Sequence, residues 1–245
     1  MVATSRSDTF TGGRGPQRAG GTSMRKRGWF LLFLLFLPIL LALIFYLTFI
    51  RQIPCGTDLF GDQGNGSFES GNFVPTTEGV MDLPDASTDL TGWTVAVDSH
   101  SNNRLRWAQN VNRFGVITKH GERFLSLIGS NLSEPYPALI RVSVPVQRGR
   151  YELGFSLGQD KQQGLPGPVS ADADVSGAAT RHQTFSTAAA GDNWQPFTMD
   201  FDVTADGSVR ITFSATSKQG PVRYVGLDNV SLRRFMTLSQ CLTGQ

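Results

Sequence analysis

The chain has 245 residues, of which 40% are hydrophobic and 17% charged, and its formal net charge is +2. Residues 1–28 carry six basic residues against one acidic residue, whereas the chain after Arg51 has a small acidic excess of about −4. This mildly acidic part gives no reason to expect nucleic-acid binding, and the absence of zinc-like His/Cys spacing excludes a zinc-finger framework.

The N-terminal part predicts a tail followed by a membrane span. Residues 1–28 are rich in Gly, Ser, Thr and Arg, which indicates a disordered basic tail. No charged residue interrupts the run from Trp29 to Ile50. At 1.5 Å per residue a helix over 29–50 would be about 33 Å long, enough to cross a hydrocarbon core of about 30 Å. We expect a transmembrane signal-anchor helix there.

The charges around this run predict its orientation. Arg25, Lys26 and Arg27 precede the run, and only Arg51 follows it closely. The basic side should stay in the cytoplasm, so the rest of the chain is expected on the extracytoplasmic side, at the cell surface, in the periplasm or in a secretory lumen. The alternative is a cleaved signal peptide. The length of the run and the lack of an Ala-x-Ala site argue against it.

Residues 51–63 are expected to form a short juxtamembrane connector to one domain over 64–245. Cys55 opens this outer region and Cys241 nearly closes it. On the oxidising side of a membrane two such thiols most simply form one disulfide. The alternative is two free thiols in a reducing compartment.

Short alternating apolar runs without helical periodicity predict an all-β domain, an antiparallel sandwich or jelly roll. Residues 138–146 and 151–157 are expected to pair as a hairpin around the turn 147–150. The expected strands are 93–97, 104–107, 123–128, 138–146, 151–157, 169–175, 181–185, 195–203, 209–213 and 224–232.

An ordered set of motifs resembles galactose-binding-like jelly rolls over about residues 64–234. The set is similar to carbohydrate-binding modules of that fold and to the cell-wall-associated domain-of-unknown-function family 642. The motifs are Asn65-Gly66-Ser67-Phe68-Glu69, Gly92-Trp93-Thr94-Val95, residues 121–127, residues 148–156, Asp192-Asn193-Trp194 and Leu227-Asp228-Asn229-Val230. The resemblance implies a module that binds surface or cell-wall glycans without catalysis.

The resemblance also implies a structural calcium site. In such modules the Glu of the opening motif and the Asp of the closing strand, here Glu69 and Asp228, often help to hold the ion. Asp228 shares strand parity with Val230, so its carboxylate is expected to face the core, where a cation would compensate it. Backbone amides or Arg223 are the alternative partners. Lys119 stands where the family often has an acidic group.

Sugar modules of this fold usually bind through loops at one edge or through a concave face. Trp107 would be the stacking platform, although it shares parity with Leu105 and is more simply a core residue. The candidate ligand-binding residues are Arg104, Arg106, Trp107, His120 and Tyr136, with the loop 159–168.

Two other functions stay open at this point. A structural or adhesion subunit would use the same sandwich to bind a protein partner. A luminal metal-dependent glycosyltransferase would use the Asp-x-Asp pairs Asp172–Asp174 or Asp200–Asp202, but it needs an α/β scaffold that the pattern does not predict. Solvent-facing acids are the simpler interpretation of both pairs.

Three Asn-x-Ser sequons are present, and Asn131 has the loop context that a glycosylation acceptor needs in a eukaryotic secretory pathway. Asn65 and Asn229 are more simply structural.

Overall fold

The computed structural model describes residues 35–61, 64–96, 104–112, 116–118, 120–128, 139–159, 168–188, 194–216 and 225–243. The chain divides into two compact units, residues 1–50 and residues 51–245, each of which is described by itself.

In the first unit, residues 35–45 are α-helical and continue into the π-helix η1 (Tyr46–Ile50), with apolar side chains exposed along this stretch. Among the described residues, no helix combines the length and the hydropathy needed to cross a membrane. The predicted span over 29–50 begins outside the described residues and stays a prediction.

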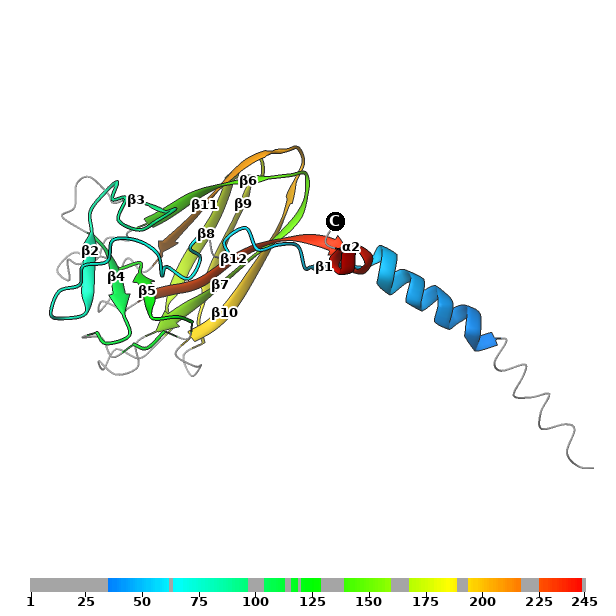
Figure 1. Ribbon diagram of the computed structural model, residues 1–245, viewed down its shortest axis with the longest axis horizontal. Helices are drawn as coiled ribbons and strands as arrows, with labels where there is room; N and C mark the ends of the chain where they lie inside the picture. Colours follow the sequence, from blue (N-terminus) through cyan, green and yellow to red (C-terminus); the bar gives the residue numbers. More distant parts are fainter. Residues whose placement is uncertain are drawn as a thin grey trace, which may run out of the picture. The chain divides into compact units, whose positions relative to one another are not determined.

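The second unit is a sandwich of two antiparallel sheets, which confirms the predicted all-β class (Figure 1). One sheet has the order β10-β7-β12-β5-β4-β2, with β1 paired to β12, and the other has the order β3-β6-β11-β8-β9. The strands are β1 (Gln52–Pro54), β2 (Val80–Leu83), β3 (Thr94–Ala96), β4 (Leu105–Gln109), β5 (Arg123–Ser126), β6 (Leu139–Val146), β7 (Gly149–Gln159), β8 (Ser170–Gly177), β9 (Arg181–Ser186), β10 (Trp194–Val203), β11 (Gly207–Ala215) and β12 (Val225–Thr237), followed by the helix α2 (Leu238–Thr243).

All ten predicted strands are present, but the predicted hairpin is wrong. β6 pairs with β3 and β11, whereas β7 pairs with β10 and β12 in the other sheet. The apolar faces of the two strands, with Ile140 and Val144 on β6 and Leu153 and Phe155 on β7, meet across the core. Alternation identifies the face that a strand buries, and it does not say whether a neighbouring strand lies beside it or opposite it.

The described part of the expected connector 51–63 belongs to the sandwich. β1 extends the seven-stranded sheet along the end of β12, with Ile53 opposite Met236, and Phe60 is buried in the core. The sequence did not predict β1, because a strand of three residues is too short to show an alternating pattern.

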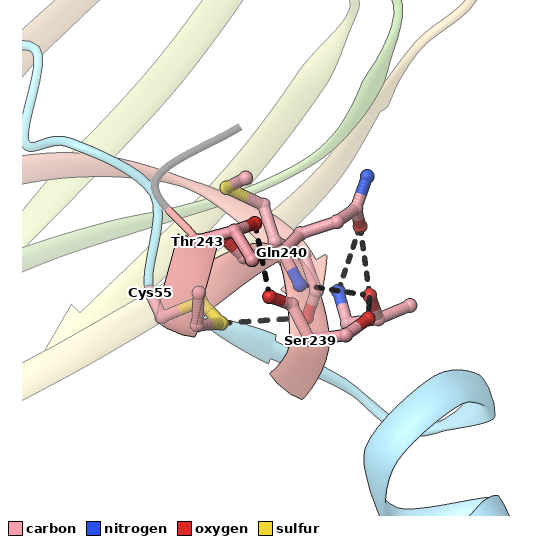
Figure 2. Close-up of a disulfide and its surroundings, with 7 residues drawn as sticks. Cys55, Ser239, Gln240 and Thr243 are labelled. Atoms are coloured by element: carbon pink, nitrogen blue, oxygen red, sulfur yellow. Dashed lines mark hydrogen bonds between the residues drawn. A yellow bond between two sulfur atoms is a disulfide. The ribbon is translucent and has the colours of Figure 1, made fainter.

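The disulfide Cys55–Cys241 confirms the predicted pairing and joins residues 186 positions apart, with their Cα atoms 5.8 Å from each other. It fastens the residue after β1 to the helix α2 (Figure 2). The start of the unit is therefore fixed to its end by covalent and strand pairing together.

The core between the sheets is apolar and rich in aromatic rings. Trp93 stacks on Phe60 with ring centroids 5.4 Å apart, and its indole N–H donates to the carbonyl of Asn65 at 3.0 Å. Phe155 lies edge-on to Phe213 of the opposite sheet at 5.0 Å. These contacts hold the two sheets together and turn the alternate side chains of each strand outwards.

Candidate functional site

A row of polar side chains crosses the outer face of the five-stranded sheet. The strand register places Thr94 of β3, Arg141 of β6, Thr212 of β11, Asp174 of β8 and His182 of β9 next to one another in that order. With strands about 4.8 Å apart, the five side chains extend over about 19 Å. All five are exposed or half-buried, so a ligand lying across the strands could contact each of them.

The sequence of β8 explains why this face is polar. Ala171, Ala173 and Val175 are buried in the core, so the intervening Asp172 and Asp174 must point outwards. Strands β6 and β11 alternate in the same way, with Arg141 and Thr212 outside. Among the described residues of these five strands, the outward positions carry no Phe, Tyr or Trp.

Hydrogen bonds between β8 and β9 fix the geometry of the acidic part of the row. Asp174 Oδ1 lies 2.6 Å from His182 Nδ1, and the Thr184 hydroxyl donates to Asp172 Oδ1 at 2.6 Å. The hydrogen bond to Asp174 and the charges of Asp174 and Asp172 raise the pKa of His182 above its usual value. The edge of the row therefore holds an imidazole biased towards its charged form.

A second polar cluster surrounds Asp228 on the seven-stranded sheet. It does not lie on the core side, where the alternation of the strand predicts the Asp228 carboxylate. Val230 and Leu232 face the core as expected, and so does Leu227. A β-bulge between Asp228 and Ser231, with Asn229 at φ 54°, shifts the register. The expectation that Asp228 faces the core is wrong, because the bulge changes the alternation.

Asp228 is nevertheless 1% exposed, since the segment around Thr118 covers it. Its carboxylate accepts hydrogen bonds from the Thr118 hydroxyl and, at 2.6 Å, from the Asn229 amide. Burial, with a smaller contribution from the charge of Glu69, raises the pKa of Asp228 to about 7 against the opposing effect of these hydrogen bonds. Asp228 is thus a buried acid whose ionisation is unfavourable.

Glu69, the other predicted calcium ligand, lies in the same charge neighbourhood. Its Oε1 atom accepts hydrogen bonds from the amides of Glu122 and Arg123, both at 2.8 Å. Its carbonyl oxygen accepts a bond from the Arg123 guanidinium. Two carboxylates that share a partly buried region fit a divalent cation in charge. Within the described residues, however, no group of three or more His, Cys, Asp or Glu gathers around one point.

The described members of the predicted ligand-binding set differ in exposure. Trp107 is fully buried, donates its indole N–H to the Phe68 carbonyl at 2.9 Å and is a core residue, so its prediction as a stacking platform is wrong. Arg106 is 8% exposed and pairs with Asp82 at 3.3 Å. Arg104 and His120 are exposed, on separate segments. Tyr136, Asn131 and residues 160–167 lie outside the described residues.

Sequence reasoning noticed Asp172 and Asp174 as a pair but missed their neighbours. His182 is isolated in the sequence, and Arg141 and Thr212 are ordinary outward positions of alternating strands. Only the order of the strands within the sheet brings the three together with Asp174.

Comparisons with known proteins find similar solved structures but no family. No family model matches the chain, and no curated protein matches it. Among solved structures it is similar to TmCBM61 in complex with beta-1,4-galactotriose, with 18% identity and a TM-score of 0.44 over 69% of this chain and 95% of the other. It is also similar to the CBM22-1 xylan-binding domain of Paenibacillus barcinonensis Xyn10C, with 14% identity and a TM-score of 0.40 over 74% of this chain and 97% of that domain.

A third similar structure is the K1 cleaved adhesin domain of Lys-gingipain from Porphyromonas gingivalis W83, with 13% identity and a TM-score of 0.42 over 69% of this chain and 95% of that domain. Carbohydrate-binding modules and an adhesin domain are thus both among these neighbours. The similarity to family 642 stays a prediction.

Proposed function

We propose that this chain is a membrane-anchored, extracytoplasmic module that binds a cell-surface or cell-wall glycan on the outer face of its five-stranded sheet, without catalysis. The observation that carries the proposal is the row from Thr94 to His182, which sets hydroxyl, guanidinium, carboxylate and imidazole groups side by side over about 19 Å.

The chemistry of the row suits a chain of sugar hydroxyls. A hydroxyl both donates and accepts hydrogen bonds, and the row offers a charged acceptor in Asp174 and charged donors in Arg141 and protonated His182. Charged partners make the stronger hydrogen bonds. Because the groups stand on strands, and Asp174 is already hydrogen-bonded to His182, little side-chain freedom would be lost on binding.

The same geometry supports a binding role over hydrolysis. Glycoside hydrolysis needs two carboxyl groups that flank the scissile bond. Asp172 and Asp174 project from the same face of one strand and would approach a sugar from one side. Each is already hydrogen-bonded to a side chain of β9.

The membrane location is part of the proposal. The basic cluster Arg25-Lys26-Arg27 before the apolar run supports an N-terminus in the cytoplasm. The Cys55–Cys241 disulfide supports an oxidising compartment for the sandwich. A polysaccharide outside the membrane is the partner that this arrangement would meet.

A structural calcium ion is also part of the proposal. The carboxylate oxygens of Glu69 and Asp228 would hold it, and the unfavourable charge of buried Asp228 is the observation in its favour. The ion would supply positive charge that stabilises the fold.

A glycan array probed with the full-length chain, with calcium present, tests the function. We expect binding to one class of polysaccharide, and loss of binding when Asp172 and Asp174 are both changed to Asn. The matched control changes Asp200 and Asp202 to Asn, since that pair has the same spacing but lies on the other sheet. Loss of binding in the control alone, or no glycan bound by the parent chain, would contradict the proposal. Stable copurification of a protein through the same face would favour an adhesion subunit.

A further inference from the structure

A pocket of about 390 Å³ opens at an end of the sandwich, away from the polar row. It is lined from both sheets, by Leu59 after β1, Val146 and Gln147 at the end of β6, Tyr151 of β7, and Arg234 and Met236 of β12. Its volume lies in the range of about 300–1,000 Å³ that is usual for small-molecule sites. Most of the lining is apolar, and one cation is included.

That cation, Arg234, points to the pocket side of β12. In the register of the sheet, Arg234 lies opposite buried Tyr151, whereas Arg233 lies opposite Glu152 on the outer face. The side chains of these two consecutive arginines therefore lie on opposite sides of the same strand.

The charge of Arg234 is not neutralised within the described part of the chain. Its guanidinium donates to Gln147 Oε1 at 3.1 Å and to the carbonyl of Arg148 at 2.6 Å, both neutral acceptors. No Asp or Glu among the described residues forms an ion pair with it, whereas Arg233 lies 3.9 Å from Asp58 Oδ2. A guanidinium has five N–H donors in a planar fork, so part of that fork is available to an anion.

The surroundings hold this guanidinium in place without a ligand. The Tyr151 hydroxyl donates to the carbonyl of Gln147 at 3.0 Å and accepts from its amide at 3.1 Å, which fixes the turn. A Cβ atom at Gly149 would lie 2.6 Å from Arg234 Nε, so glycine is needed for the guanidinium to lie against the turn. The amide of Gly56 donates to the Arg234 carbonyl at 3.1 Å. The site is therefore preorganised.

We infer that this pocket binds a small carboxylate-bearing molecule, with the carboxylate on Arg234 and the body of the molecule on Leu59, Val146 and Met236. A planar carboxylate matches the guanidinium fork with two parallel hydrogen bonds. The sugar acid of an acidic glycan and a free apolar organic acid share this chemistry. The inference does not rest on glycan binding by the sheet face.

Calorimetric titration of the full-length chain at low salt tests the inference with two matched pairs of probes. D-galacturonate is compared with D-galactose, and benzoate with benzamide. A hydrogen bond to a charged group contributes about 1.5–3 kcal/mol, so the acid of at least one pair should bind about tenfold or more tightly than its neutral partner. Binding of galacturonate alone indicates a sugar acid, and binding of benzoate alone indicates an apolar acid.

Arg234→Gln should abolish acid binding, and Arg233→Gln should preserve it, because both remove the same charge from neighbouring residues of one strand. If Arg234→Gln does not fold, Arg234→Lys replaces it and should bind several-fold more weakly, since an ammonium lacks the planar fork. Equal loss in Arg233→Gln and Arg234→Gln, equal binding of acid and neutral probes, or no acid bound would overturn the inference. The double Asp172→Asn/Asp174→Asn variant should keep acid binding, which separates this result from the glycan test.

Discussion

Thr118 and Asp228 are hydrogen-bonded through their side chains although 110 residues separate them. The bond lies on the side of the seven-stranded sheet away from the core, beneath the segment that includes Thr118. It links a loop to the closing strand at the place where the β-bulge has turned the carboxylate outwards. The ionisation of Asp228 therefore affects both the loop and the sheet.

Stability should fall as the pH rises from about 4 to 7. Asp228 has a pKa of about 7 in the fold against the usual 3.8 of an aspartate, so the folded protein holds this proton more tightly than the unfolded chain. Its contribution is complete below pH 3.8 and is lost as the pH rises through about 7, by at most about 4 kcal/mol. Urea denaturation at several pH values should show the unfolding free energy of the parent chain falling as the pH rises, and a smaller fall in Asp228→Asn. Asp202→Asn, at an exposed position, is the control. A pH dependence in Asp228→Asn equal to that of the parent chain would contradict the prediction.

Calcium should oppose this loss if Glu69 and Asp228 hold the proposed ion. At a concentration about 100 times its Kd, calcium should add about 2.7 kcal/mol of stability at pH 8. Thermal unfolding with calcium or with a chelator measures the difference. Glu69→Gln should abolish the calcium effect, and a chelator that leaves the melting temperature of the parent chain unchanged would remove the ion from the proposal.

His182 should titrate above its usual value because of its neighbours on β8. The hydrogen bond to Asp174 and the nearby negative charges favour the imidazolium, so the pKa of His182 is raised. Asp174→Asn should lower that pKa, and glycan binding should weaken as the pH rises through it. NMR titration of the ring protons gives the pKa directly in both proteins. Identical His182 titration in both proteins would show that Asp174 does not act on it.

Substitutions of Trp107 and His120, two of the predicted ligand-binding residues, should have very different effects on stability. Trp107 is fully buried against Phe73, with ring centroids 4.8 Å apart, so Trp107→Ala should cost about 3–5 kcal/mol of unfolding free energy. His120 is exposed, and His120→Ala should change stability by no more than about 0.5 kcal/mol. Chemical denaturation measures both. A small loss in Trp107→Ala would argue that the indole is not a core anchor.

Loss of the disulfide should destabilise the sandwich through its ends. Closing a loop with a sequence separation of 186 is worth about 5 kcal/mol in the chain-entropy model. The double variant Cys55→Ser/Cys241→Ser should lower the unfolding free energy by up to that amount. The parent chain should match it under reducing conditions, and equal stability with and without reductant would show that the bridge contributes little.

The sequence by itself determined ten of the twelve described strands and the faces that their regularly alternating stretches bury. Alternation in Ala138 to Val146 and Gln195 to Val203 follows from the two-residue period of a strand, which is a local property. The pairing of Cys55 with Cys241 followed from their number and position. These features need no knowledge of which strands are neighbours.

Tertiary structure decided the rest, because strand order, bulges and loop coverage depend on contacts between distant residues. It separated β6 and β7 into two sheets, turned Asp228 away from the core, and buried Trp107 under Phe73. It also aligned Arg141, Thr212, Asp174 and His182 from four strands into one row. A row that runs across strands has no period along the chain, so no sequence pattern could have indicated it.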